Sequence, residues 1–125
     1  MRLELIAVPV TDVDQAKEFY VEKVGFNADH DHDMGEVRFV QLTPPGSACS
    51  IAIGRGITDG EPGAVKGIQV VVDDIQAARA ELAERGVEVS DVMDMGPAGL
   101  FVRFADPDGN EWSVQEIVRE RAVTS

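Results

Sequence analysis

Cysteine, histidine and basic residues are all scarce in this sequence of 125 residues. The single cysteine, Cys49, cannot form a disulfide within the chain. The 11 lysines and arginines face 23 aspartates and glutamates, so the formal net charge is -12. Such a charge repels nucleic acid and anionic membrane surfaces. It would attract a cationic ligand, although acidity that only keeps the protein soluble is the simpler explanation.

Other features are absent altogether. No apolar run approaches the roughly 20 residues that a membrane-spanning helix needs. The N-terminus begins with a strand-like alternation and has no apolar signal core. No catalytic triad or dinucleotide motif is present, because Gly54-Arg55-Gly56 lacks a third glycine and a following helix. Together with the unpaired cysteine, these absences predict a soluble protein of the reducing cytoplasm.

The sharpest local signal is Ala105-Asp106-Pro107-Asp108-Gly109-Asn110-Glu111-Trp112. Pro107 restricts one φ angle, and Gly109 or Asn110 can adopt a positive φ. We therefore expect a tight turn here, with residues 100–104 folding back on residues 112–117 as a hairpin.

Apolar periodicity predicts alternating strands and helices along the rest of the chain. Two amphipathic helices are expected after the capping residues Asp12 and Asp74, ending at Gly25 and Gly86. Residues 54–66 are rich in glycine and proline and are expected to form a linker. The remaining predicted strands are residues 3–10, 26–33, 37–42, 48–53, 67–72 and 87–92.

The two halves of the chain repeat one another. Residues 10–16, VTDVDQA, match residues 72–78, VDDIQAA, and Val37-Arg38-Phe39 recurs as Val102-Arg103-Phe104. A period of about 60 residues indicates a duplicated module of one strand, one helix and three strands. Each curved sheet would leave an apolar face to bury, and a cleft between sheets is a natural ligand site.

These motifs, in this order and spacing, resemble the vicinal oxygen chelate superfamily, which contains glyoxalase I, bleomycin and fosfomycin resistance proteins and extradiol dioxygenases. The resemblance is carried by residues 8–14, 16–20, 24–26, 70–75, 86–87 and 104–110. It implies an α+β fold in which two βαβββ modules form a cupped mixed β-sheet, assembled as a homodimer. We expect a single domain, with module 1 at about 1–54, a linker at about 55–66, module 2 at about 67–118 and a polar tail at 119–125.

In metal-dependent members of that superfamily, histidine, glutamine or glutamate ligands project into the cup from the first and last strands of each module. The matching positions here hold Leu5, Ala52, Gly67 and Ser113. Three of them offer no donor side chain, and a serine hydroxyl is a poor ligand. A register shift of two offers Gln69 with Glu111 or Gln115, but nothing on the first strand. We therefore predict no cofactor, with a divalent metal at a displaced site as the alternative.

Histidines and arginines supply further candidates. His30 and His32 would share one face of a strand and could clamp a transition metal, although a solvated edge strand whose charges discourage edge pairing explains them more simply. Arg38 and Arg103 could hold a substrate carboxylate in the cup, or could pair with acids on neighbouring strands. Aromatic side chains could wall a pocket or pack in the core; they are Phe39, Phe101, Phe104 and Trp112.

The function that this pattern favours is a metal-free binder of small molecules, similar to the drug-sequestering resistance proteins. One alternative is a metal-dependent glyoxalase-like lyase, isomerase or dioxygenase with a displaced metal site, so the sequence leaves open whether the protein is an enzyme. The other alternative is a non-catalytic interaction domain. The expected cup-lining residues are Leu5, Ala52, Gln69, Phe101, Arg103, Glu111 and Ser113.

Overall fold

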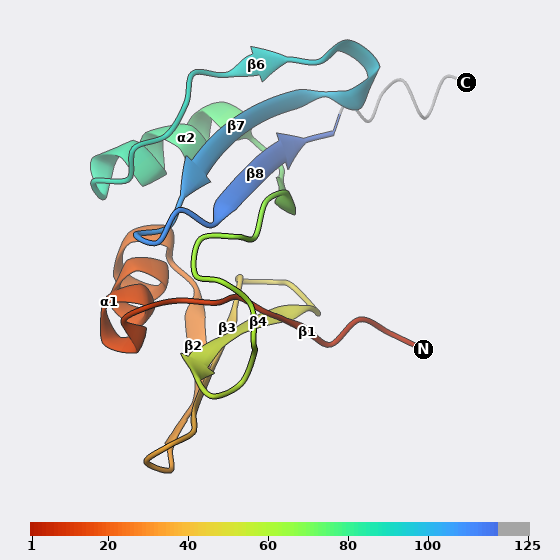
Figure 1. Ribbon diagram of the computed structural model, residues 1–125. Helices are drawn as coiled ribbons and strands as arrows, with labels where there is room; N and C mark the ends of the chain where they lie inside the picture. The colour runs from red at the N-terminus through yellow and green to blue at the C-terminus, as the bar shows by residue number, and fades with distance from the viewer. Residues whose placement is uncertain (118–125) are drawn as a thin grey trace. The chain divides into compact units, whose positions relative to one another are not determined.

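The structure, a computed structural model, describes residues 1–117. The chain divides into two compact units. Among the described residues, the first holds Met1–Val65 and Asp106–Asn110, and the second holds Lys66–Ala105 and 111–117. Each unit contains a four-stranded mixed sheet with a helix against one face (Figure 1). The predicted polar tail, 119–125, lies outside the described residues.

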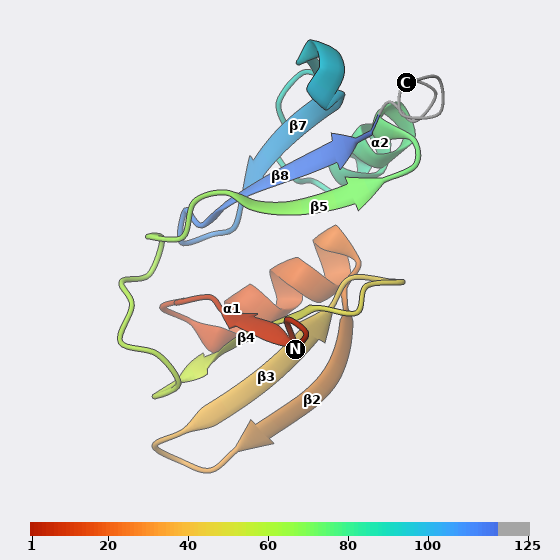
Figure 2. The same ribbon diagram turned by 90° about the vertical axis from the view of Figure 1, so that its right-hand side faces the viewer.

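The first unit runs strand, helix, strand, strand, strand. Its sheet has the order β1-β4-β3-β2, in which β1 is parallel to β4 and the other neighbours are antiparallel (Figure 2). The elements are β1 (Leu5–Ala7), α1 (Val13–Glu18), the π-helix η1 (Phe19–Val24), β2 (Asn27–Asp33), β3 (Arg38–Thr43) and β4 (Ser50–Arg55).

Both ends of the first helical segment are where the sequence predicts them. Asp12 caps α1, because its Oδ1 accepts the N–H of Gln15 at 3.0 Å. The segment ends at Gly25, whose φ of 93° suits glycine best. The second half is a π-helix, a feature that the apolar period does not predict; there the N–H groups of Gly25 and Phe26 both donate to the carbonyl of Tyr20.

The second unit repeats the same element order, which confirms the predicted duplication and the α+β fold. Its sheet has the order β5-β8-β7-β6, with β5 parallel to β8. The elements are β5 (Ile68–Val72), α2 (Ile75–Glu84), β6 (Met93–Asp94), the short 3₁₀ helix η2 (Gly96–Ala98), β7 (Leu100–Ala105) and β8 (Glu111–Glu116). None of the helices in residues 1–117 has the length and apolar character needed to cross a membrane.

Side chains alternate across each sheet, and one set forms the core beneath the helix. In the first unit this set includes Val40 and Leu42 of β3 with Ile51 and Ile53 of β4. In the second unit it includes Val102 and Phe104 of β7 with Trp112 and Val114 of β8, where the rings of Phe104 and Trp112 stack 5.9 Å apart. The opposite set of side chains lies on the face away from the helix.

The prediction of a strand at 87–92 is wrong. Only Met93–Asp94 pairs with β7. Ser90 explains the difference, because its carbonyl accepts from Nε of Arg79 at 2.8 Å while its hydroxyl accepts the backbone N–H of Arg103 at 2.9 Å. In a regular ladder the N–H of Arg103 would donate to a strand carbonyl. Here it donates to the Ser90 side chain instead, so a regular ladder cannot form.

The predicted hairpin is confirmed, and its turn is part of the first unit. β7 and β8 pair antiparallel from Leu100↔Glu116 to Ala105↔Glu111. The carboxylate of Asp106, a residue 5% exposed, accepts four hydrogen bonds. Its Oδ1 accepts the N–H groups of Asp108 and Asn110, and its Oδ2 accepts the Tyr20 hydroxyl at 2.7 Å and the Asn110 amide at 2.8 Å.

Asn110 ties the same turn to two further segments of the first unit. Its Nδ2 donates to the carbonyl of Pro9 at 2.8 Å, and its Oδ1 accepts the N–H of Val65 at 3.1 Å. Asn110 is completely buried, so all of these polar groups depend on one another for hydrogen bonds.

Replacing Tyr20 by phenylalanine should lower the free energy of unfolding by about 2 kcal/mol, because a buried carboxylate loses one of its four donors. Chemical denaturation followed by circular dichroism measures the change. Ser47→Ala, which removes an exposed hydroxyl from a local turn, is the control and should change stability by less than about 0.5 kcal/mol. Equal losses in the two variants would contradict a central role for the Tyr20–Asp106 bond.

Candidate functional site

We call the face of each sheet opposite its helix the open face. The open face of the first sheet is formed by Leu5, Ala7, His30, His32, Phe39, Gln41, Thr43, Ser50 and Ala52, which alternate with the buried core positions. The open face of the second sheet is formed by Gln69, Val71, Met93, Phe101, Arg103, Ala105, Glu111, Ser113 and Gln115.

Strand register arranges the second open face in rows. Gln69 pairs with Ser113, which pairs with Arg103, so these three polar side chains form one row across β5, β8 and β7. The next row is Val71, Gln115, Phe101 and Met93. Neighbouring strands lie roughly 4.8 Å apart, so each row places its side chains within reach of one small molecule.

Two amides of this face have orientations set by hydrogen bonding. Nε2 of Gln115 donates to the carbonyl of Ala98 at 2.8 Å, and a carbonyl oxygen can only accept. Oε1 of Gln115 is therefore turned to Gln69, whose Nε2 donates to it at 2.6 Å. Oε1 of Gln69 remains as an exposed acceptor at the end of this chain of bonds.

The charges of the second open face differ in their surroundings. Glu111 lies 3.5 Å from Nζ of Lys66, and both side chains are more than half exposed. The Arg103 side chain is exposed and makes no hydrogen bond or ion pair with any residue in 1–117. Its backbone N–H is held by Ser90, which fixes the strand but leaves the guanidinium free.

The open face of the first sheet carries a hydroxyl network. Oγ of Ser50, a residue 4% exposed, lies 2.6 Å from Oγ1 of Thr43 and accepts from Nε2 of Gln41 at 3.2 Å. Thr43 also donates to the carboxylate of Asp29, next to the bulge in β2. His30 and His32 lie on the same face, with their rings stacked 5.8 Å apart and both residues exposed.

The positions expected from metal-dependent enzymes do not form a metal site. Leu5 and Ala52 lie on the first open face and Ser113 on the second, while Gly67 precedes β5 with a φ of 91°. In the part of the chain that the structure describes, no three or more histidine, cysteine, aspartate or glutamate side chains are grouped to hold a metal ion. His30 and His32 therefore have no third ligand of these types. The residues present do not fit the divalent metal that the superfamily implies.

Comparison with known proteins agrees with this fold. Residues 2–114 match the family model for the Glyoxalase/Bleomycin resistance protein/Dioxygenase superfamily. The chain belongs to this superfamily. The resemblance inferred from the sequence is thereby confirmed.

Three relatives of the chain cover nearly its whole length. YetH of Bacillus subtilis (strain 168), described as uncharacterized, is 32% identical over 113 residues, which are 89% of this chain and 94% of that protein. TnmS3, described as an antibiotic binding protein from Streptomyces sp. CB03234, is 35% identical and superposes with a TM-score of 0.85, over 94% of this chain and 96% of its own. A superfamily member from Sphaerobacter thermophilus DSM 20745 is 30% identical with a TM-score of 0.82, over 93% and 97% of the two chains.

Five of the seven predicted cup-lining residues are neighbours on the second open face: Gln69, Phe101, Arg103, Glu111 and Ser113. The other two, Leu5 and Ala52, lie on the first. Sequence reasoning missed Val71 and Met93. The two-residue period of β5, counted from Gln69, would have found Val71, but Met93 depends on the short pairing of β6 with Phe101.

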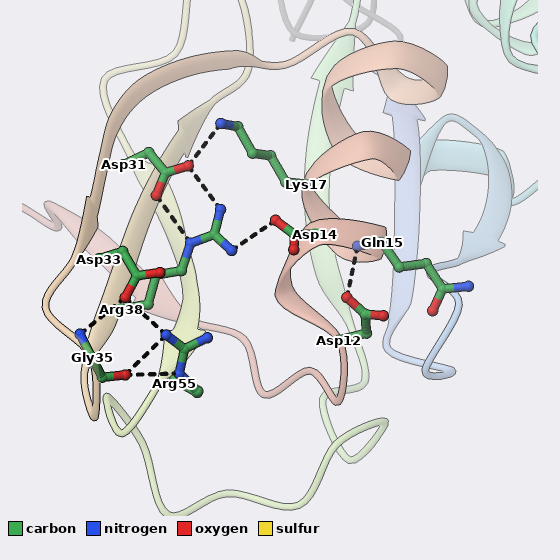
Figure 3. Close-up of polar contacts among 9 residues, drawn as sticks. All are labelled: Asp12, Asp14, Gln15, Lys17, Asp31, Asp33, Gly35, Arg38 and Arg55. Atoms are coloured by element: carbon green, nitrogen blue, oxygen red, sulfur yellow. Dashed lines mark hydrogen bonds and ion pairs between the residues drawn. The ribbon is translucent and has the colours of Figure 1, made fainter.

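Arg38 does not lie on an open face, so its predicted role as a substrate anchor is wrong. Its Nε and Nη2 bind the two carboxylate oxygens of Asp31 at 3.1 and 2.9 Å, and its Nη1 binds Asp14 of α1 at 2.7 Å (Figure 3). Lys17 of the same helix donates to Asp31 at 2.8 Å. Arg38 therefore pairs with acidic side chains, which was the alternative to holding a substrate carboxylate. Through these pairs it links the sheet to its helix.

The equivalence of Phe39 with Phe104 in the predicted repeat is also wrong. Phe104 is a core residue that is 5% exposed, whereas Phe39 alternates with the core and lies on the open face. In the strand registers Gln41 lies opposite Ala52 and Arg103 opposite Ser113, so the sequence match is displaced by an odd number of residues. An odd displacement moves a side chain to the other face of a strand. Arg38 and Arg103 point to opposite faces for the same reason.

Hydrogen bonds lower the pKa of two aspartates in β2. The guanidinium of Arg38, and then the ammonium of Lys17, hold the pKa of Asp31 well below its ordinary value. The pKa of Asp33 is lowered mainly by the backbone N–H of Gly35, which lies 3.0 Å from its carboxylate (Figure 3).

Asp31→Asn should lower the free energy of unfolding by about 1 kcal/mol at neutral pH, since the Arg38 and Lys17 bonds are partly screened by solvent. The pKa of Asp31 is depressed in the folded state, so its stabilisation is complete above the ordinary pKa of about 3.9 and is lost as the pH falls below it. The difference in free energy of unfolding between wild type and variant should therefore disappear below about pH 4, as measured by urea unfolding at a series of pH values. Asp91→Asn, at a side chain 99% exposed, is the control; a gap for Asp31→Asn that is independent of pH would contradict the assignment.

Proposed function

We propose that the protein binds a small organic molecule without a metal ion, using the open face of the second sheet. The observation that carries this proposal is the row Gln69, Ser113 and Arg103 beside the row that contains Phe101. Ligand sites combine apolar and aromatic contacts with a few polar groups that set orientation, and these two rows supply both.

The similarity to TnmS3 supports a ligand of the antibiotic class. That protein is described as antibiotic binding, and it shares 35% identity over 94% of this chain. Only the kind of activity, binding of a small molecule, is carried over to this chain. We also expect a homodimer, and a reducing cytoplasm in keeping with the free thiol of Cys49.

The chemistry of the second open face suits binding. Half-buried Phe101 can pack against a flat ligand, and the hydroxyl of Ser113 can donate or accept at the centre of the polar row. The Gln69–Gln115–Ala98 chain holds two amides in fixed orientations before a ligand arrives, which reduces the entropy lost on binding.

Binding should be independent of divalent metals. Protein purified without chelator should contain no stoichiometric metal by elemental analysis, and Ni²⁺, Mn²⁺, Zn²⁺ or Fe²⁺ should not raise its melting temperature. The physical reason is the lack of donor side chains at Leu5, Ala52 and Gly67. One metal per chain, lost in Gln69→Ala or Glu111→Ala, would overturn the proposal in favour of a metal-dependent enzyme.

Filling the centre of the polar row should block the site. Ser113→Tyr places a large side chain between Gln69 and Arg103, so compounds that stabilise the wild type in a thermal-shift screen should lose at least about 1 kcal/mol of binding energy, or roughly fivefold in affinity. Ala80→Tyr, on the exposed side of α2, adds the same bulk elsewhere and should leave binding intact. Compounds that bind Ser113→Tyr as tightly as the wild type would place the site elsewhere.

A further inference from the structure

Arg103 gives the second open face a local charge opposite to that of the whole protein. The other charged side chain on this face, Glu111, is accompanied by Lys66 at 3.5 Å. Arg103 makes no ion pair or hydrogen bond through its side chain within residues 1–117. In a protein of net charge -12, the Arg103 guanidinium thus has no carboxylate within ion-pair distance among residues 1–117.

The neighbours of Arg103 leave its guanidinium open to a ligand. Ser113 is directly opposite on β8, and Ala105 follows two residues later on the same face of β7. Both side chains are small. On the other side, two residues earlier, Phe101 offers a ring to a flat molecule. A planar guanidinium beside an aromatic ring can bind a carboxylate through two parallel N–H bonds, or donate to the single oxygen of a phenolate, while the ring covers the ligand's apolar part.

The far end of the same row offers the complementary group. Because Nε2 of Gln69 donates to Gln115, its Oε1 is left to accept a hydrogen bond. Two strand spacings separate Gln69 from Arg103, which is roughly 10 Å between their backbones. A ligand of two fused rings can span this row.

We propose that the open face of the second sheet selects planar aromatic anions, with a carboxylate or phenolate on Arg103 and a hydroxyl or N–H group directed at Gln69. This inference rests on the proposed function and specifies its ligand class. It opposes the expectation from the net charge, which favours a cationic ligand, because the charge nearest the ligand outweighs distant charges that solvent screens.

Three probes of equal shape test the sign of the ligand charge: naphthoate, the neutral methyl naphthyl ketone and naphthylmethylammonium. Each is titrated into isotope-labelled protein, and the backbone signals of residues 101, 103 and 113 are followed by NMR. Naphthoate should bind at least roughly tenfold more tightly than the ammonium probe, the effect expected for charge-assisted hydrogen bonds. Equal or tighter binding of the ammonium probe at these signals would overturn the inference while leaving a small-molecule site in place.

Variants identify the residue responsible. Arg103→Gln should abolish the preference for naphthoate, and Arg103→Lys, which keeps the charge but loses the planar fork, should retain part of it. Arg85→Gln is the matched control, since it removes the same charge from an exposed pair with Glu81 on α2. An equal loss in Arg85→Gln would show a long-range effect of net charge and overturn the role of Arg103.

Gln69 is tested separately by comparing hydroxynaphthoate with naphthoate. The wild type should favour the hydroxyl compound, and Gln69→Leu should lose this advantage while it still binds naphthoate. An advantage that persists in Gln69→Leu would overturn the assignment of Gln69. If none of the probes moves the signals of the face in correctly folded wild-type protein, both the inference and the proposed function fail.

Discussion

The buried carboxylate of Asp106 is the constraint on which much of the first unit depends. It brings together a helix residue, Tyr20, and the amide of Asn110, which in turn holds the carbonyl of Pro9 and the N–H of Val65. Burying a carboxylate is costly unless hydrogen bonds replace its water, and four donors do so here. The π-helical turn belongs to the same arrangement, because Tyr20 lies within it and its carbonyl accepts two N–H groups.

The same element order serves different purposes in the two units. In the first, Arg38 of β3 and Asp31 of β2 lie on the helix side of the sheet, where Arg38 binds Asp31 and also Asp14 of α1. In the second, Arg103 turns to the open face and remains unpaired among the described residues. The two arginines differ in which face of the strand they occupy, and this difference separates a structural arginine from a candidate ligand anchor.

The superfamily is known for both metal-dependent enzymes and binding proteins, so membership alone does not decide the activity. In this chain Leu5, Ala52 and Gly67 stand at positions where the resemblance to metal-dependent members places ligands, and none of the three has a donor side chain. The open face of the second sheet carries other hydrogen-bonding groups, which are amides, a hydroxyl and a guanidinium. Such groups suit recognition of an organic molecule better than coordination of a metal ion.

The sequence alone determined the duplicated strand and helix order, the caps at Asp12 and Asp74, the turn at 106–110 and the superfamily. These features depend on local periodicity, on side chains that bond to nearby backbone, and on residues with special φ angles. It also indicated five neighbours of the second open face, through the resemblance to the superfamily, a register shift of two, the repeated arginine and the aromatic candidates. Only the tertiary structure decided that Arg38 faces the helix, that Ser90 replaces a strand bond, and that Met93 joins the row of Phe101. Each of these three features depends on pairing between segments that are distant in the chain. A shift of one residue in such pairing moves a side chain to the other face of the sheet, while the local sequence pattern stays the same.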